Sequence, residues 1–221
     1  PDHLKIIKEV TEKTLLGFEV VDESEDACTI QNIAEPSYDK YDIILRKIFL
    51  NIKNDAQEFY DELKKGKLEN MNKWEEQKNN IDNFTNFLRR VIINNKVGGT
   101  RNSYLLFYLI SHLSLIQHAY YYLYKYIAEN KGTLGKDIIN LFKESNDTYN
   151  MLYEAYYKKD LELAHNVRAL RDDLQKNKIY PMLEKKTGID AVALYHIGEI
   201  IRITSLASTI IFTVTKELEE A

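Results

Sequence analysis

Apolar residues recur every three or four positions along most of the chain beyond Pro36. This spacing is typical of amphipathic helices, which turn one face toward a core. The clearest stripe has the heptad spacing 4-3-4-3-4 and consists of Leu45, Phe49, Ile52, Ala56, Phe59 and Leu63. Glycines interrupt the pattern at Gly66, Gly98, Gly99, Gly132, Gly135 and Gly188. The sequence therefore predicts six helices, over residues 45–65, 68–95, 102–129, 136–158, 160–186 and 190–219, with a break or bend at Pro181.

Two stretches of the chain look like copies of one helical unit. Tyr60 corresponds to Tyr153, Lys67-Leu68-Glu69 to Asp160-Leu161-Glu162, and Ile81 to Leu174. The offset is constant, because 153 − 60, 160 − 67 and 174 − 81 all equal 93. A repeat of this length contains two or three helices. We therefore expect a mostly α fold with two tandem three-helix bundles, residues 37–130 and 131–221, related by a pseudo-twofold axis.

Residues 1–36 have a different pattern from the rest. A short helix ending at Gly17 is followed by two β-type runs, residues 18–21 and 27–33, joined by an acidic polar turn. This predicts a small element made of one helix and a β-hairpin. A lone hairpin is marginally stable, so the element either packs on the bundle or completes a sheet with strands from elsewhere.

Charge and composition narrow the class of protein. The net charge of −4 argues against nucleic acid or an anionic membrane surface as the main partner of these residues. Cys28 is the one cysteine, which favours a reducing cytoplasmic location. The start at Pro1, without an initiator Met, favours an excerpt of a longer protein. Residues 102–124 carry no Asp, Glu, Lys or Arg, but their polar residues and helical spacing favour a central bundle helix over a membrane span.

A resemblance to a known family rests on the N-terminal element and on the repeat. The residues that carry it are Leu15-Leu16-Gly17-Phe18-Glu19-Val20-Val21-Asp22-Glu23-Ser24-Glu25-Asp26, Ile30-Gln31 and Glu35-Pro36-Ser37. This run resembles the linker of archaeal phosphate-uptake regulators, in which an AbrB-like DNA-binding domain precedes a PhoU domain. The helical repeat from Ser37 onward looks like PhoU itself. The resemblance implies a cytoplasmic regulator of phosphate uptake that contacts the transporter ATPase or a sensor kinase. No DNA-binding domain is visible in these 221 residues.

PhoU domains hold iron or zinc clusters through acidic motifs of the form Glu/Asp-x-x-x-Asp. Several carboxylates on one helix face must converge to bind such cations. The eight positions that align with these motifs are Lys78, Asp82, Ser114, His118, Arg171, Gln175, Ile201 and Ser205. Asp82 is the one carboxylate among them, so we expect no family-type metal cluster and no cofactor.

Lys78 and Arg171 interrupt equivalent apolar stripes of the two repeats. In one interpretation, each side chain packs its stem and extends its charge to water, or pairs with an acid on a neighbouring helix. In the other, the two cations mark an anion site.

The third predicted helix carries a tyrosine cluster that includes Tyr120, Tyr121, Tyr122 and Tyr124. These residues cannot all face one side of a helix, so some belong to the core and others to an interface. We take the four as a candidate interface and expect a homodimer. The sequence has neither a Gly-rich phosphate loop nor a nucleophile–base motif, so we expect a protein that is not an enzyme. The alternative is a helical bundle, sensor or enzyme, that binds a metal ion or an anion.

Overall fold

A computed structural model describes residues 2–24, 27–33, 37–68 and 70–219. The N-terminal element consists of α1 (Asp2–Thr14), β1 (Phe18–Glu23) and β2 (Cys28–Asn32). A 3-10 turn, η1 (Tyr38–Lys40), leads into α2 (Tyr41–Lys65), α3 (Met71–Asn95) and α4 (Gly99–Glu129). The remaining elements are α5 (Lys136–Lys158), α6 (Leu161–Leu174), the π-helical turn η2 (Gln175–Ile179), α7 (Tyr180–Leu183) and α8 (Gly188–Glu219). The expected mostly helical fold with a small N-terminal hairpin is confirmed.

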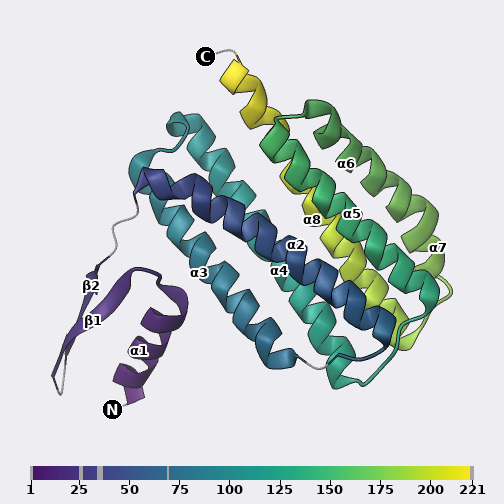
Figure 1. The fold of residues 1–221 in the computed structure, drawn as a ribbon, viewed down its shortest axis with the longest axis horizontal. Coiled ribbons are helices and arrows are strands. Elements are labelled where there is room, and N and C mark those ends of the chain that lie inside the picture. Colours follow the sequence, from purple (N-terminus) through teal and green to yellow (C-terminus); the bar gives the residue numbers. More distant parts are fainter. Residues whose placement is uncertain (1, 25–26, 34–36, 69, 220–221) are drawn as a thin grey trace.

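The long helices pack into one continuous body (Figure 1). In that view α2 and α5 lie in front of α4 and α8, while α3 and α6 lie on opposite flanks. Direct packing joins α4 to α8, α3 to α4, and α5 to both α6 and α8. Aromatic rings fill the core of the first half: Trp74 stacks on Tyr124 at 4.6 Å, and Phe59 meets both rings edge-on. Fully burying rings of this size is a large favourable term in folding.

Helices α2 and α5 end in the same way. Gly66 follows α2 with φ of 67°, and Lys159 follows α5 with φ of 53°. In both, the backbone N–H of this left-handed residue bonds to carbonyls of the last helical turn, which satisfies acceptors that the helix leaves free. The two caps are 93 residues apart, since 159 − 66 = 93.

The region around Pro181 differs from one continuous helix. The helix from Leu161 ends at Leu174, and a π-helical turn precedes the short helix α7. Proline has no N–H to donate, so a carbonyl of the preceding turn loses its α-helical partner and the backbone widens. The expected interruption near Pro181 takes the form of the π-helical turn Gln175–Ile179 just before it, and the expected helix 160–186 is therefore divided. Helix α4 also begins at Gly99, three residues before the expected start at Asn102.

The hairpin forms one small antiparallel sheet, with Phe18 opposite Asn32 and an irregularity between Val20 and Asp22. Its helix α1 packs against α3. Arg90 of α3 donates a hydrogen bond to the carbonyl of Leu16, and its guanidinium lies 4.5 Å from the centre of the Phe18 ring. Of the two expected arrangements, the structure has the one in which the element packs on the bundle.

Among the described residues, no helix combines the length and apolar character that crossing a bilayer requires. The uncharged segment 102–124 lies within α4, which packs against α2, α3 and α8.

Candidate functional site

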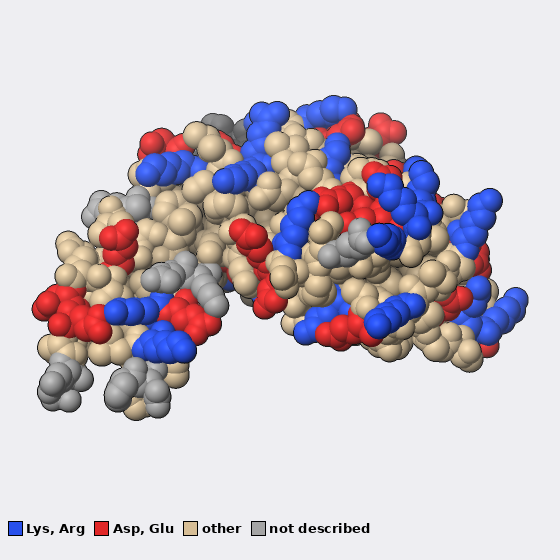
Figure 2. All heavy atoms as spheres, turned by 60° about the horizontal axis from the view of Figure 1, so that its bottom comes forward, with Lys and Arg blue, Asp and Glu red and all other residues tan. Residues whose placement is uncertain are grey.

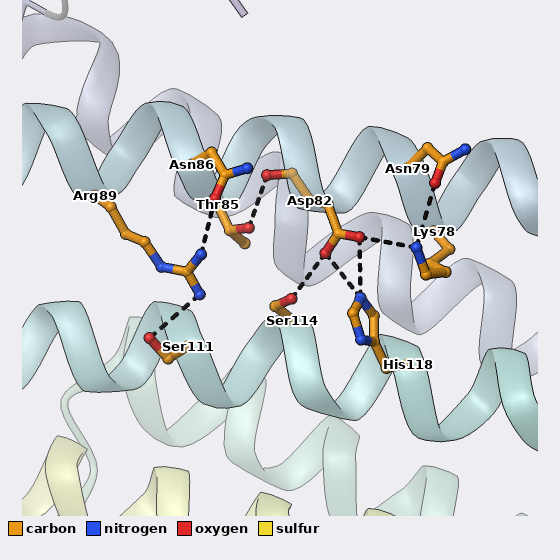
Figure 3. A network of polar contacts seen from close by, with 9 residues as sticks. All are labelled: Lys78, Asn79, Asp82, Thr85, Asn86, Arg89, Ser111, Ser114 and His118. Atoms are coloured by element: carbon orange, nitrogen blue, oxygen red, sulfur yellow. Dashed lines mark hydrogen bonds and ion pairs between the residues drawn. The ribbon is translucent and has the colours of Figure 1, made fainter. Parts of the chain in front are cut away.

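Four polar side chains meet between α3 and α4, and we call them the α3–α4 polar cluster (Figure 3). The carboxylate of Asp82 is its centre. Lys78 Nζ lies 3.0 Å from Oδ2, and Ser114 donates to Oδ1 at 2.9 Å. His118 Nε2 lies 2.8 Å from Oδ1 and 3.0 Å from Oδ2. The side chains of Lys78, Asp82 and His118 are each between 20% and 27% exposed, so the cluster borders the solvent.

Helix geometry explains why these four residues meet. Lys78 and Asp82 are four residues apart on α3, and Ser114 and His118 are four residues apart on α4, so each pair shares a helix face. The two helices pack side by side, which brings the two faces together. These are the first four of the eight positions that the sequence analysis aligned with the metal motifs of PhoU domains. The structure therefore brings into contact the four residues that the sequence analysis had identified by their spacing.

The surroundings of Asp82 keep its carboxylate ionised. Burial opposes the charge and by itself raises the pKa, but hydrogen bonds from His118, Lys78 and Ser114 outweigh it, and the pKa lies below its ordinary value. An ionised carboxylate only accepts hydrogen bonds, so the proton between Asp82 and His118 resides on Nε2. Because the folded pKa is depressed, this contribution to stability is present above the ordinary carboxyl pKa and is lost as the pH falls through the folded value.

The cluster does not have the arrangement of a nucleophilic catalyst. In a catalytic triad the serine donates to the histidine, which then removes its proton. Here Ser114 donates to Asp82 instead, and the same carboxylate holds His118. Neither contact activates the hydroxyl for attack.

The cluster also offers few ligands to a metal ion. Asp82 and His118 are its two metal-binding side chains, and the Lys78 ammonium already contacts one carboxylate oxygen. Across the described part of the chain, no three His, Cys, Asp or Glu side chains are grouped so as to hold a metal. Hard cations require six or more oxygen ligands, some of them from water.

A second set of polar contacts continues along the same helix pair. Arg89 of α3 donates to Asn86 at 2.9 Å and to Ser111 of α4 at 3.3 Å (Figure 3). Its guanidinium also lies 5.6 Å from the centre of the Phe107 ring. Burial lowers the pKa of Arg89, and the nearby Asp82 charge partly opposes this effect. Arg89 thus helps hold the two helices together.

The second repeat has no counterpart of the cluster. Arg171 Nε lies 3.0 Å from its sequence neighbour Asp172, and Gln175 begins the π-helical turn. Ile201 and Ser205 are buried in α8. Lys78 and Arg171 stand on α3 and α6, on opposite flanks of the bundle (Figure 1), and each pairs with an acid on its own helix. The structure therefore does not bring the two cations together, and the acid that pairs with Lys78 lies four residues away on the same helix.

Three of the four tyrosines proposed as an interface are buried. Tyr120 donates to Asn146 of α5 at 2.8 Å, and Tyr124 donates to Glu62 of α2 at 2.6 Å. Tyr121 is also buried, whereas Tyr122 is 49% exposed. Of the candidate interface residues, only Tyr122 is available at the surface.

A buried carboxyl was missed by the sequence analysis. Asp55 of α2 is 4% exposed and accepts a hydrogen bond from Gln117 of α4 at 2.8 Å. Burial raises its pKa to about 6, although the Gln117 hydrogen bond opposes the shift. Its position was a usable signal, because Asp55 lies at helical spacing between Ile52 and Phe59 of the apolar stripe.

Comparisons of the chain with protein-family models, with curated proteins and with solved structures gave no match. The resemblance to PhoU therefore depends on the residues quoted above.

Proposed function

We propose that this protein is a PhoU-like, non-enzymatic regulator of phosphate uptake that acts through contacts with other proteins. By the family resemblance, its partners are the ATPase subunit of a phosphate transporter or a sensor kinase. The observation that best supports the proposal is the pair of matched helix caps at Gly66 and Lys159, 93 residues apart. A duplicated three-helix unit accounts for this match, and such duplication is the family's architecture.

The layout of the helices supports the same proposal. Helices α2, α3 and α4 form one set of three, and α5, the divided helix α6 to α7, and α8 form the next. The N-terminal helix and hairpin precede both sets, as the resemblance implies.

The chemistry of the described residues favours binding over catalysis. The α3–α4 polar cluster satisfies its own charges and hydrogen bonds, and its serine is not activated. On the face drawn in Figure 2, basic and acidic side chains are interspersed, which suits specific protein contacts better than the uniform field that attracts nucleic acid.

A second candidate function is a sensor that binds a metal ion or an anion. It is favoured by the position of the α3–α4 polar cluster, which borders the solvent and occupies the aligned motif positions. The ion pair between Lys78 and Asp82 weakens this candidate, because each charge already neutralises the other.

The proposal is tested with purified proteins and in cells. We expect the chain to bind the phosphate transporter ATPase or the sensor kinase from its own organism, and not the ATPase of an amino-acid transporter, in calorimetric titrations. Deleting its gene should alter phosphate uptake by phosphate-replete cells. An absence of binding to both partners, together with unchanged uptake, would overturn the proposal.

A further inference from the structure

Helix α4 carries a line of side chains at its surface, and the large apolar ones among them are about half exposed or more. Within it, Tyr104 is 67% exposed, Tyr108 60%, and Leu115 and Tyr122 49% each. These residues follow heptad spacing, 4-3-4-3-4, together with two partly exposed polar residues. We call the following six residues the α4 stripe: Tyr104, Tyr108, Ser111, Leu115, His118 and Tyr122.

The α4 stripe lies opposite the side of α4 that bonds to α2 and α5. At about 100° per residue, Gln117, Tyr120 and Tyr124 lie roughly half a turn away from it. Those three residues are buried and bond to α2 or α5. The stripe therefore holds large apolar groups that the described bundle leaves uncovered, which is characteristic of an interaction surface.

The charges around the stripe suit a second copy of the same chain. No Asp, Glu, Lys or Arg occurs between residues 102 and 124, so the stripe itself carries no charged side chain that would repel its copy. Arg89 of α3 borders it through the hydrogen bond to Ser111. His118 borders Lys78 and Asp82, which neutralise each other. A strongly charged partner would find no complementary charge on the stripe itself.

The two ends of the stripe are complementary in shape. At one end, Tyr104 and Tyr108 help to line a mainly apolar cavity of about 410 Å³ between α3 and α4, together with Ile92, Ile93 and Phe107. At the other end, the half-exposed ring of Tyr122 projects from α4. A twofold axis that reverses the helix direction brings the ring of one copy to the cavity of the other.

We propose that two copies of this chain associate through the α4 stripe, with their α4 helices antiparallel about a twofold axis near residue 113. In this register, residue 104 of one copy faces residue 122 of the other, residue 108 faces residue 118, and residue 111 faces residue 115. The contact extends along about 27 Å of helix, from the rise of 1.5 Å per residue. The dimer rests on the proposed function and adds a second copy of the chain to its partners. Because the dimer is tested on the purified chain alone, its failure can be distinguished from a failure of the proposed function.

The available area is sufficient for a specific dimer of modest affinity. With roughly 150–250 Å² for each large side chain, the exposed parts of the stripe and of Ile93 amount to about 500–600 Å² per chain. Two copies then bury on the order of 1,100 Å², slightly above the ~1,000 Å² expected of a biological interface.

The first test is the mass of the purified chain in solution, measured by light scattering and sedimentation between 1 and 100 μM (concentrations chosen to bracket roughly micromolar affinity). We expect twice the chain mass of 26.0 kDa at the upper concentration. Leu115→Glu should raise the dissociation constant at least about 30-fold, because two charges would enter the centre of the contact. Ile43→Glu is the matched control, since Ile43 is 70% exposed on α2 and should leave the dimer unchanged.

A cross-linking experiment tests the register in a Cys28→Ser background. Chains with Tyr104→Cys mixed with chains with Tyr122→Cys should be joined by a short bis-maleimide, whereas either variant alone should not. In the antiparallel register, identical end positions are about 27 Å apart.

Three results would overturn the inference: a monomer at 100 μM, a dimer that Leu115→Glu leaves intact, or cross-links within the single variants only. A monomer that instead binds the transporter ATPase through Leu115 would assign the stripe to that partner. Circular dichroism of Leu115→Glu should show unchanged helicity, because this side chain is half exposed in the single chain.

Discussion

Replacing Asp55 by Asn should stabilise the protein at neutral pH and change little at pH 4. Asp55 is buried between α2 and α4, and its carboxyl accepts a hydrogen bond from Gln117 Nε2 at 2.8 Å. Gln117 Oε1 is buried without a partner among the described residues. A protonated Asp55 has an O–H to offer, whereas the ionised form must be held in a poorly solvated site. Asparagine resembles the protonated form in size and lacks the charge.

The magnitude follows from the pKa of Asp55, which burial raises from 3.8 to about 6. Between these values the folded protein keeps a proton that the unfolded chain has released. Stability of the wild type therefore falls as the pH rises through this window, and the cost is complete above pH 6. At 1.36 kcal/mol per pKa unit, the full cost is roughly 3 kcal/mol. For a chain of this length, Asp55→Asn should then raise Tm by about 6–12 °C at pH 7.5.

The assay is urea and thermal unfolding, followed by circular dichroism at pH 4, 6 and 7.5. Asp42→Asn is the control, because Asp42 is an exposed aspartate on the same helix and its replacement should change stability by no more than about 0.5–1 kcal/mol. A stability difference between Asp55→Asn and wild type that does not change with pH would refute this reasoning. So would a loss of stability at every pH, which would mean that the ionised carboxylate is needed.

Lys78→Met should cost roughly 0.5–1 kcal/mol in urea unfolding, because Asp82 loses one donor and keeps two. Phosphate should not raise Tm more in the wild type than in a Lys78→Met/Arg171→Met double variant, with chloride at matched ionic strength as the control; a phosphate shift confined to the wild type would reveal an anion site. Tyr120→Phe should cost about 1–2 kcal/mol by leaving Asn146 Oδ1 without its donor. Elemental analysis of protein purified without chelators or a His tag should find no stoichiometric metal; several ions per chain would favour the sensor alternative.

The elements that the sequence predicted well are those with local causes. Helix α5 has the expected bounds, Lys136–Lys158, because glycine at one end and a tight left-handed turn at the other stop the helix. The members of the α3–α4 polar cluster could also be identified from the sequence. A spacing of four places two residues on one face wherever a helix forms, so aligning two such pairs on neighbouring helices identified all four members.

What the sequence did not predict depends on which helices lie side by side. Periodicity shows that α4 is apolar on more than one face, but it does not rank those faces by exposure. Tyr120 and Tyr124 are covered by α5 and α2, contacts between residues far apart in the chain. Tyr104 and Tyr108, which lie nearer the N-terminal end of the same helix, are exposed. The tyrosine-rich segment was therefore recognised as unusual, while most of its exposed members were missed.

The offset of 93 pairs α4 with α8, and the chain covers these two helices unequally. Tyr108 corresponds to Ile201, and Leu115 corresponds to Ser208. Tyr108 and Leu115 are 60% and 49% exposed. Ile201 and Ser208 are instead buried in the packing of α8 with α4, α5 and α6. If the two helices are copies of one unit, as the offset of 93 suggests, the exposed face of α4 is the one left for the proposed dimer to cover. The exposed face of α4 carries large apolar residues where solvent exposure alone would favour polar ones. This inequality, rather than the number of tyrosines, is the reason to look for the dimer contact on α4.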